Sequence, residues 1–127
     1  MTKRTAGPPS RARVTGPKVG LVACAVLAGC FGRDPPSLVS DDPGLKIPAI
    51  KQAVQAKDLT AAPQLVSDLE SDDPAVRLYA IQGLRRLSGD EFGYHYYADA
   101  DARKPAVARW QAWLAAERDA GRIPRPR

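Results

Sequence analysis

The chain has 127 residues, with 19 basic and 14 acidic side chains, and a formal charge of +5. The first 29 residues carry five of the basic side chains and no acidic one, so the rest of the chain is neutral. An electrostatic basis for nucleic-acid binding by that neutral part is therefore excluded.

Residues 1–29 have the pattern of an export signal. A basic segment with proline and glycine, Met1 to Lys18, precedes an apolar run of eleven residues from Val19 to Gly29. Such a run is too short to cross ~30 Å of hydrocarbon as a helix, which takes roughly 20 residues. A short apolar run between a basic leader and small residues is typical of a secretory signal peptide. We expect residues 1–29 to be cleaved off.

The end of this run indicates how the protein is anchored. The segment LAGC, residues 27–30, resembles the lipobox of bacterial lipoproteins, in which the cysteine receives a diacylglycerol and the chain is cut just before it. The resemblance implies that Cys30 becomes the lipidated first residue, because two or more acyl chains anchor a protein stably to a membrane. Cys24 would be discarded, which leaves no free thiol in the mature domain. The alternative is a buried segment with an incidental cysteine.

Two segments around the central region predict disorder. Residues 30–43 combine the lipidated cysteine with prolines, serines and aspartates, and are expected to form a flexible tether that spans on the order of 20 Å. Residues 122–127 alternate arginine with proline and are expected to be a disordered tail. The folded domain is therefore predicted over residues 44–121.

That domain contains an internal repeat. A shift of 31 residues places DPGLKIPAIKQAVQAKD, residues 42–58, on DPAVRLYAIQGLRRLSG, residues 73–89. Each copy precedes a second helical pattern, at residues 60–71 and 102–121. The sequence therefore predicts an all-α fold with about four helices in two antiparallel helical hairpins.

The helix over residues 73–89 has the clearest boundaries. Asp73 suits the N-cap, Pro74 the first helical position and Gly89 a left-handed C-cap. Asp73 and Arg77 are four residues apart and are predicted to form an ion pair. The apolar stripe is wide enough for a helix packed between neighbours and consists of Val76, Leu78, Ala80, Ile81, Gly83, Leu84 and Leu87.

The other three helices carry narrower apolar sets. These are Ile47, Ile50 and Val54 in the first, Leu65, Val66 and Leu69 in the second, and Val107, Trp110 and Leu114 in the fourth. Pro48 interrupts the first pattern, so its regular part is predicted to begin near Lys46. Two repeats are fewer than the three that a solenoid usually needs. We therefore expect either the tryptophans to close the core or the domain to pair with another copy or a partner.

The stretch DPAVRLYAIQGLRRL, residues 73–87, resembles the HEAT-repeat pattern, with an aspartate before the helix, Val-Arg on its first turn, and alanine and a small residue before leucine further along. Residues 45–120 also resemble small HEAT-type lipoproteins of bacteria, through KIPAI, DDPAVRLYAI and GDEFGY. The resemblance implies a short HEAT-like α-solenoid with a scaffolding role, and implies no enzymatic activity.

The aromatic stretch EFGYHYY, residues 91–97, supplies the candidate binding residues. Tyr94, His95, Tyr96 and Tyr97 form a recognition patch in one interpretation, because tyrosine is enriched at binding hot spots. In the other, which we favour, the stretch folds back over the last helix and packs its rings on Trp110. Even then, four rings in one segment predict at least one exposed tyrosine edge.

The remaining polar residues favour structural roles. His95 is the only histidine and has no His, Cys or Glu at ligand spacing, so we expect no general base, metal or cofactor. Asp99 and Asp101 are expected to cap the last helix and favour its dipole. Six basic residues form either a rim toward lipid head groups or an acidic partner, or, as we favour, solvated faces: Lys46, Lys51, Lys57, Arg77, Arg85 and Arg86.

These observations predict a lipoprotein held to a membrane of the cell envelope, periplasmic or outer face, by lipid on Cys30. Its HEAT-like domain is expected to act as a protein–protein interaction or scaffold module with an unknown protein partner and no nucleic acid. The contact region is expected at the aromatic stretch and on the helices that begin each repeat. The alternatives are a self-associating structural protein, hence a homo-oligomer, and an accessory chromophore lyase, since HEAT-like repeats also occur in such lyases.

Overall fold

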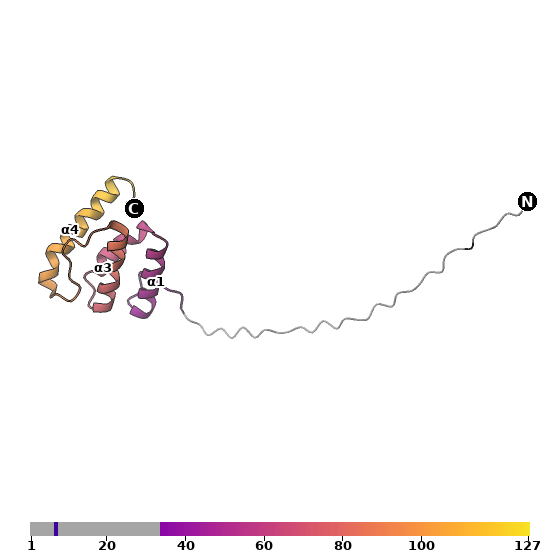
Figure 1. Cartoon of the computed structure of the whole chain (residues 1–127), viewed down its shortest axis with the longest axis horizontal. Coiled ribbons are helices and arrows are strands. Elements are labelled where there is room, and N and C mark those ends of the chain that lie inside the picture. The colour runs from indigo at the N-terminus through magenta and orange to yellow at the C-terminus, as the bar shows by residue number, and fades with distance from the viewer. Residues whose placement is uncertain (1–6, 8–33) are drawn as a thin grey trace, which may run out of the picture. The chain divides into compact units, whose positions relative to one another are not determined.

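The computed structural model describes residue 7 and residues 34–127 (Figure 1). Its regular elements are α1 (Pro43–Gln55), the 3-10 helix η1 (Leu59–Ala61), α2 (Ala62–Asp68), α3 (Pro74–Ser88) and α4 (Ala100–Asp119). Every regular element in the described part of the chain is helical, which confirms the predicted all-α fold. The expected signal peptide and the lipobox with Cys30 lie outside the described residues.

The two copies of the repeat begin in the same way. Asp42 accepts a hydrogen bond from the backbone N–H of Gly44 at 2.8 Å, and Asp73 accepts one from that of Ala75 at 2.7 Å. In both copies a proline follows the capping aspartate, where its missing N–H needs no partner. α1 and α3 thus start 31 residues apart, at the spacing of the sequence repeat.

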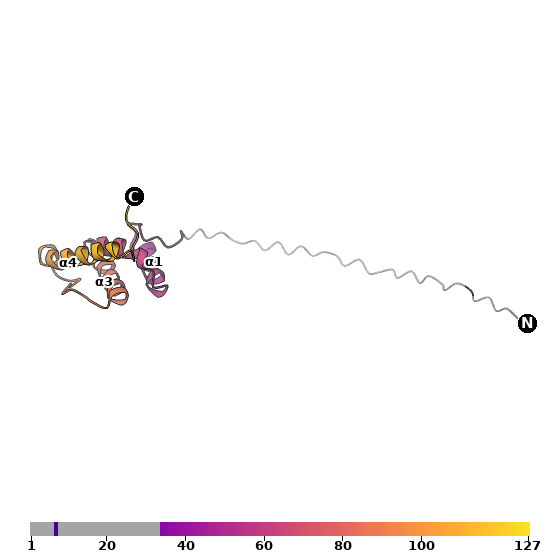
Figure 2. The same cartoon turned by 90° about the horizontal axis from the view of Figure 1, so that it is seen from above.

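α3 is the central helix. It packs against both α1 and α2, and α2 also packs against α4. Figure 1 and Figure 2 both show α3 between α1 and α4. Its wide apolar stripe therefore faces neighbours on two sides, as predicted. The largest fully buried side chains are contributed by all four helices and the C-terminal segment: Ile50, Leu65, Leu69, Val76, Leu84, Trp110 and Ile123.

α1 begins at Pro43 and contains Pro48, so the prediction of a start near Lys46 is wrong. Pro48 leaves the carbonyl of Gly44 without its helical donor. Gly44 is exposed, and water can supply that donor. The Asp42 cap and the burial of Ala49 and Ile50 outweigh the remaining cost. α4 likewise begins two residues earlier than expected and contains a proline, Pro105.

Both ends of the domain extend beyond the predicted boundaries of residues 44 and 121. Leu38 packs against the core, and the N–H of Ser37 donates to the carbonyl of Leu45 at 3.2 Å. At the other end Ile123 is buried in the core, although the tail was predicted to be disordered from residue 122. The apolar side chains in these segments were too isolated in the sequence to signal packing.

Gly83 sets the close approach of α1 to α3. A Cβ at this position would lie 2.8 Å from Val54 Cγ2 and 3.2 Å from Leu65 Cδ1. Glycine within a helix costs about 1 kcal/mol relative to alanine. Gly83 therefore lowers the helix propensity of α3 and in return allows the close packing of α1.

We expect Gly83→Ala to lower the free energy of unfolding by about 1 kcal/mol. Overpacking costs about 1–3 kcal/mol and exceeds the gain in helix propensity. Urea denaturation of the variant measures the change. In a Val54→Ala background the nearest clashing methyl is absent, and the same substitution should become neutral or stabilising. A penalty of equal size in both backgrounds would contradict steric control by Val54.

Candidate functional site

Tyr94, His95, Tyr96 and Tyr97 lie in the segment that joins α3 to α4, residues 89–99. The structure separates them into two classes. Tyr94 is only 4% exposed and belongs to the core, whereas Tyr97 is 71% exposed. His95 is exposed and Tyr96 is half-buried. The predicted lipid attachment residue, Cys30, lies outside the described part of the chain.

Tyr94 performs the packing role that the sequence favoured for the whole stretch. Its hydroxyl donates a hydrogen bond to the backbone carbonyl of Leu69, the residue that follows α2. Burial raises the pKa of Tyr94 above its usual value of 10.0, and the nearby Arg103 and Arg77 partly oppose that shift. Phe92 packs edge-on against Trp110, with ring centroids 4.7 Å apart, as expected for rings that fold over α4.

The other three residues form an exposed aromatic surface. The rings of His95 and Tyr97 stack with centroids 5.5 Å apart, and the ring of Tyr96 meets that of Tyr97 edge-on at 5.3 Å. Tyr96 is half-buried and thus connects the exposed pair to the domain. We call His95, Tyr96 and Tyr97 the aromatic surface. The prediction of at least one exposed tyrosine edge is confirmed at Tyr97.

Three arginines hold the backbone of the connection that carries the aromatic surface, residues 89–99, which we call the aromatic segment. Arg77 Nε of α3 donates to the carbonyl of Tyr96 at 2.8 Å, and Arg109 Nη1 of α4 donates to that of Phe92 at 2.9 Å. Arg103, also in α4, donates to the carbonyl of Ala98. These hydrogen bonds fix the segment before any partner arrives, which reduces the entropy lost on binding.

Arg77 does not form the predicted ion pair with Asp73. Its Nη1 donates instead to the carbonyls of Ser71 and Asp72, at 2.6 Å and 2.9 Å, in the turn before α3. The carboxylate of Asp73 already accepts the N–H groups of the first helical turn. Arg77 therefore links the turn between α2 and α3 to the aromatic segment.

Tyr94→Phe and Tyr97→Ala should separate the core role from the surface role. Tyr94→Phe loses one buried hydrogen bond, and we expect the free energy of unfolding to fall by about 1 kcal/mol. Because Tyr97 is exposed, Tyr97→Ala should change it by less than about 0.5 kcal/mol. Thermal and urea unfolding measure both changes. A larger loss for Tyr97→Ala than for Tyr94→Phe would contradict this assignment.

Tyr94 also gives the stability a pH dependence. Its pKa is raised in the folded state, so the stability that its neutral form contributes is present below pH 10.0 and is lost as the pH rises through the folded-state pKa. The unfolded state loses the proton first. Tyr94→Phe should therefore remove part of the alkaline fall in stability.

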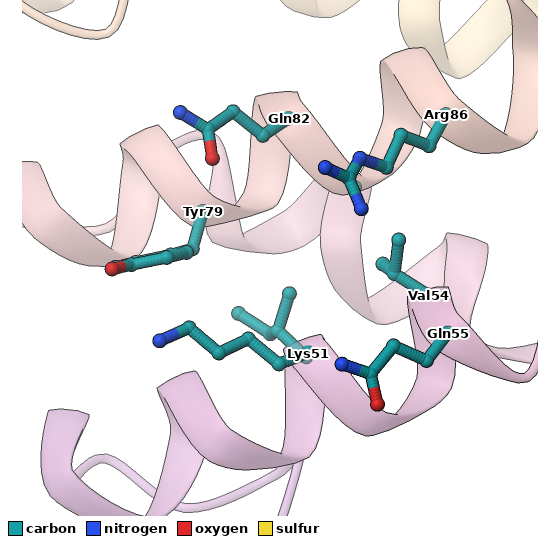
Figure 3. Close-up of a pocket in the computed structure, with 8 residues that line it drawn as sticks. Lys51, Val54, Gln55, Tyr79, Gln82 and Arg86 are labelled. Atoms are coloured by element: carbon teal, nitrogen blue, oxygen red, sulfur yellow. The ribbon is translucent and has the colours of Figure 1, made fainter.

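Two hollows flank the exposed side of α3. One, about 240 Å³, lies between α3 and the aromatic segment, and its lining includes Ile81, Arg85, His95 and Tyr97. The other, about 220 Å³, lies between α1 and α3 (Figure 3). Gln82 lines both hollows. The aromatic surface and the α1/α3 groove are therefore joined through the exposed side of α3.

The α1/α3 groove combines an apolar floor with a basic rim. Figure 3 shows Lys51 of α1 beneath the ring of Tyr79 and Arg86 of α3 above the groove. Lys51 Nζ lies 4.7 Å from the centroid of the Tyr79 ring, a cation–π contact. Ile50 and Gly83 contribute to the apolar part. None of the acidic residues in the described part of the chain lines the groove.

The six basic residues expected on solvated faces lie in different environments, and that expectation is wrong for Lys46 and Arg77. Lys46 and Arg77 are buried, and Arg85 pairs with Glu91 at 2.7 Å. Lys51 and Arg86 line the groove. Helical spacing places these basic side chains on helix faces. It does not show which residues of other segments surround them, and those neighbours decide their roles.

Five acidic residues line a third hollow of about 600 Å³. It is lined by α1, α2 and the turn between α2 and α3, and includes Asp41, Glu70, Asp72 and Asp73. Lys46 reaches it from α1 and pairs with Asp68 of α2 at 2.8 Å. Glu70 and Asp72 are exposed. Neither forms an ion pair among the described residues.

The expected caps of α4 are only partly seen. Asp99 occupies the N-cap position, but its side chain makes no capping hydrogen bond. Asp101 lies in the first turn, where its charge favours the helix dipole, and pairs with Lys104 at 2.6 Å. Within residue 7 and residues 34–127, no group of three or more His, Cys, Asp or Glu could hold a metal ion.

Comparison with known proteins found no match for this chain among protein-family models, curated proteins or solved structures. Within the described residues, none of the helices combines the length and the apolar character needed to span a membrane.

Sequence reasoning missed the α1/α3 groove. Its lining residues were read as part of helix faces, because a groove forms only where two helices approach closely. The usable signal was Gly83, a helical glycine opposite an aliphatic residue of α1. The residues that line the groove are Ile50, Lys51, Val54, Gln55, Tyr79, Gln82, Gly83 and Arg86.

Proposed function

We propose that this protein is a membrane-anchored lipoprotein of the cell envelope whose short HEAT-like domain binds a protein partner. The observation that carries the binding role is the aromatic surface: Tyr97 and His95 stack in solvent on a backbone held by three arginines. Exposed aromatic rings in a preorganised segment are typical of binding hot spots.

The hollow beside this surface supports the same role. Ile81 and Tyr96 contribute apolar lining, and Arg85 and Glu91 provide charged groups at its edge. Hot-spot side chains typically fill a pocket on the opposite protein, and the surrounding contacts exclude water from it. A partner side chain can occupy the hollow while Tyr97 and His95 contact the partner's surface.

The HEAT-like classification is supported by the repeated helix starts. Each copy has an aspartate cap followed by proline, and α3 packs against the helices on both sides. Solenoid repeats bury their core against neighbouring repeats. A domain with only two repeats lacks such neighbours, and a bound partner can take their place.

The anchor is tested by the intact mass of the protein from the membrane fraction of its native host. We expect a chain that begins at Cys30 and carries additional acyl mass. A soluble, unmodified chain that begins at Met1 would contradict lipidation and would return the five basic leader residues to the working protein.

The binding role is tested by photo-crosslinking in host membranes. Benzoylphenylalanine replaces His95 or Tyr97 in the aromatic surface. The matched control carries it in place of Ala112 of α4, which is exposed and lines none of the three hollows. We expect the same discrete adduct from positions 95 and 97 and none from position 112. Equal labelling at all three positions, or no adduct at 95 and 97, would contradict a partner at this surface.

A further inference from the structure

The domain carries two sets of exposed charges that form no ion pair with the described residues. The first is the basic rim of the α1/α3 groove. Lys51 and Arg86 are exposed and form no ion pair with any described residue. Among residues 34–127 no carboxylate lines the groove, and the Lys51 ammonium lies against the ring of Tyr79.

The second set lies on the turn between α2 and α3. Glu70 and Asp72 are exposed there, two residues apart, without an ion pair in the described part of the chain. The turn is held in shape, because Arg77 Nη1 binds the carbonyls of Ser71 and Asp72. The two carboxylates are therefore presented on a fixed backbone.

We propose that a second copy of this chain docks its α2–α3 turn in the α1/α3 groove. Glu70 and Asp72 of the incoming copy meet Lys51 and Arg86, and the amides of Gln55 and Gln82 face the turn's polar backbone. Complementary charges of this kind fix register and accelerate encounter. A tight turn with exposed side chains also fits a groove of about 220 Å³ better than a whole helix does.

A second copy is favoured over an unrelated acidic protein because both charge sets are present on this chain. The part of the chain from Cys30 onward is neutral, so two copies are not kept apart by net charge. The two contact surfaces differ, which makes the interface heterologous and allows further copies to add in the same direction. Stacking of copies would also supply the neighbours that a two-repeat domain lacks.

This self-association is independent of partner binding at the aromatic surface. None of Lys51, Arg86, Glu70 and Asp72 belongs to that surface, and the two roles fail separately. Loss of self-association by charge reversal in the groove should leave the crosslinked adduct at Tyr97 unchanged. Loss of that adduct in turn leaves the self-association result intact.

The test uses the full chain in non-ionic detergent, with sedimentation velocity over a range of protein concentrations. We expect the wild type to associate at 50 mM NaCl, and the Kd to rise at least about tenfold at 500 mM NaCl, because exposed charges are screened. Lys51→Glu/Arg86→Glu and Glu70→Lys/Asp72→Lys should each remain monomeric, since like charges then meet. An equimolar mixture of the two variants should associate again, because each groove then meets a turn of opposite charge.

The control for Lys51→Glu/Arg86→Glu is Lys57→Glu/Arg127→Glu, which makes the same change in charge at exposed residues that line none of the three hollows. It should associate like the wild type. The recovery in the mixture also shows that the variants are folded. A wild type that stays monomeric at all concentrations would overturn the proposal, even if an acidic peptide bound the groove. Failure of the mixture to recover would overturn it as well.

Discussion

Asp68→Leu is expected to lower the free energy of unfolding by about 3 kcal/mol, because it leaves the ammonium of Lys46 buried without its counter-charge. Lys46 is 8% exposed, and its Nζ lies 2.8 Å from Asp68 Oδ1. Gln64 also donates to the same oxygen at 3.0 Å. The pair joins α1 to α2 beside the acidic hollow. Water in that hollow can partly hydrate the orphaned Lys46, so the cost should lie at the low end for a broken buried pair.

The double variant Lys46→Met/Asp68→Leu distinguishes loss of the pair from loss of packing. Replacing both charges by apolar side chains removes the desolvation cost together with the attraction, and we expect a stability within about 1 kcal/mol of the wild type. Asp101→Leu breaks the exposed pair with Lys104 and is the matched control, with an expected loss below about 0.5 kcal/mol. Urea denaturation measures all three. A double variant as unstable as Asp68→Leu would show that packing, not an unpaired charge, dominates.

Local signals in the sequence predicted both ends of α3 correctly. The caps at Asp73 and Gly89 depend on residues within one turn, so the sequence contains what decides them. The apolar stripe of α3 also predicted a helix between neighbours, since its width reflects contacts on two sides. The caps and the apolar stripe are both patterns within residues 73–89, so the local sequence is enough to predict them.

The errors concern residues whose role depends on distant segments. Pro48 was expected to delay α1, but the Asp42 cap and the core contacts of Ile50 hold the helix from Pro43. Arg77 was expected to pair with Asp73 four residues away, yet its guanidinium reaches carbonyls in two other segments. Helical spacing describes only the neighbours on the same helix.

The candidate site was predicted as a segment, not as a set of roles. The sequence placed four candidate residues in one connection, but the fold decides which of them is buried. Tyr94 reaches the carbonyl of Leu69, which is 25 positions away in sequence. Tyr97 lies only three positions from Tyr94 and faces solvent. No periodic pattern distinguishes them, because the segment is not a regular helix.

Arg77→Met should lower the free energy of unfolding by about 3 kcal/mol and should loosen the aromatic surface. Arg77 is 9% exposed and donates to three backbone carbonyls, of Ser71, Asp72 and Tyr96. A hydrogen bond from a charged donor contributes about 1.5–3 kcal/mol, and the three carbonyls, in partly buried contacts, lose their donor together. The apolar stem of methionine retains part of the packing, which keeps the loss below the sum of the three bonds.

The same change should have a local effect that general destabilisation does not produce. The N–H groups of Tyr94 and Ala98 donate to carbonyls within the aromatic segment. We expect their hydrogen exchange to accelerate more in Arg77→Met than that of Asp58, whose N–H bonds to Ala53 at the end of α1.

Arg109→Met is the matched control for this prediction. Arg109 is exposed and donates a single hydrogen bond, to the carbonyl of Phe92, so its loss should cost less than about 1 kcal/mol. Arg77→Lys tests the geometry, since an ammonium lacks the guanidinium's fork and cannot serve both segments at once. It should be intermediate in stability and should retain little protection at Ala98. If Arg77→Met costs no more than Arg109→Met, the aromatic surface is held by its ring packing, and its preorganisation does not depend on Arg77.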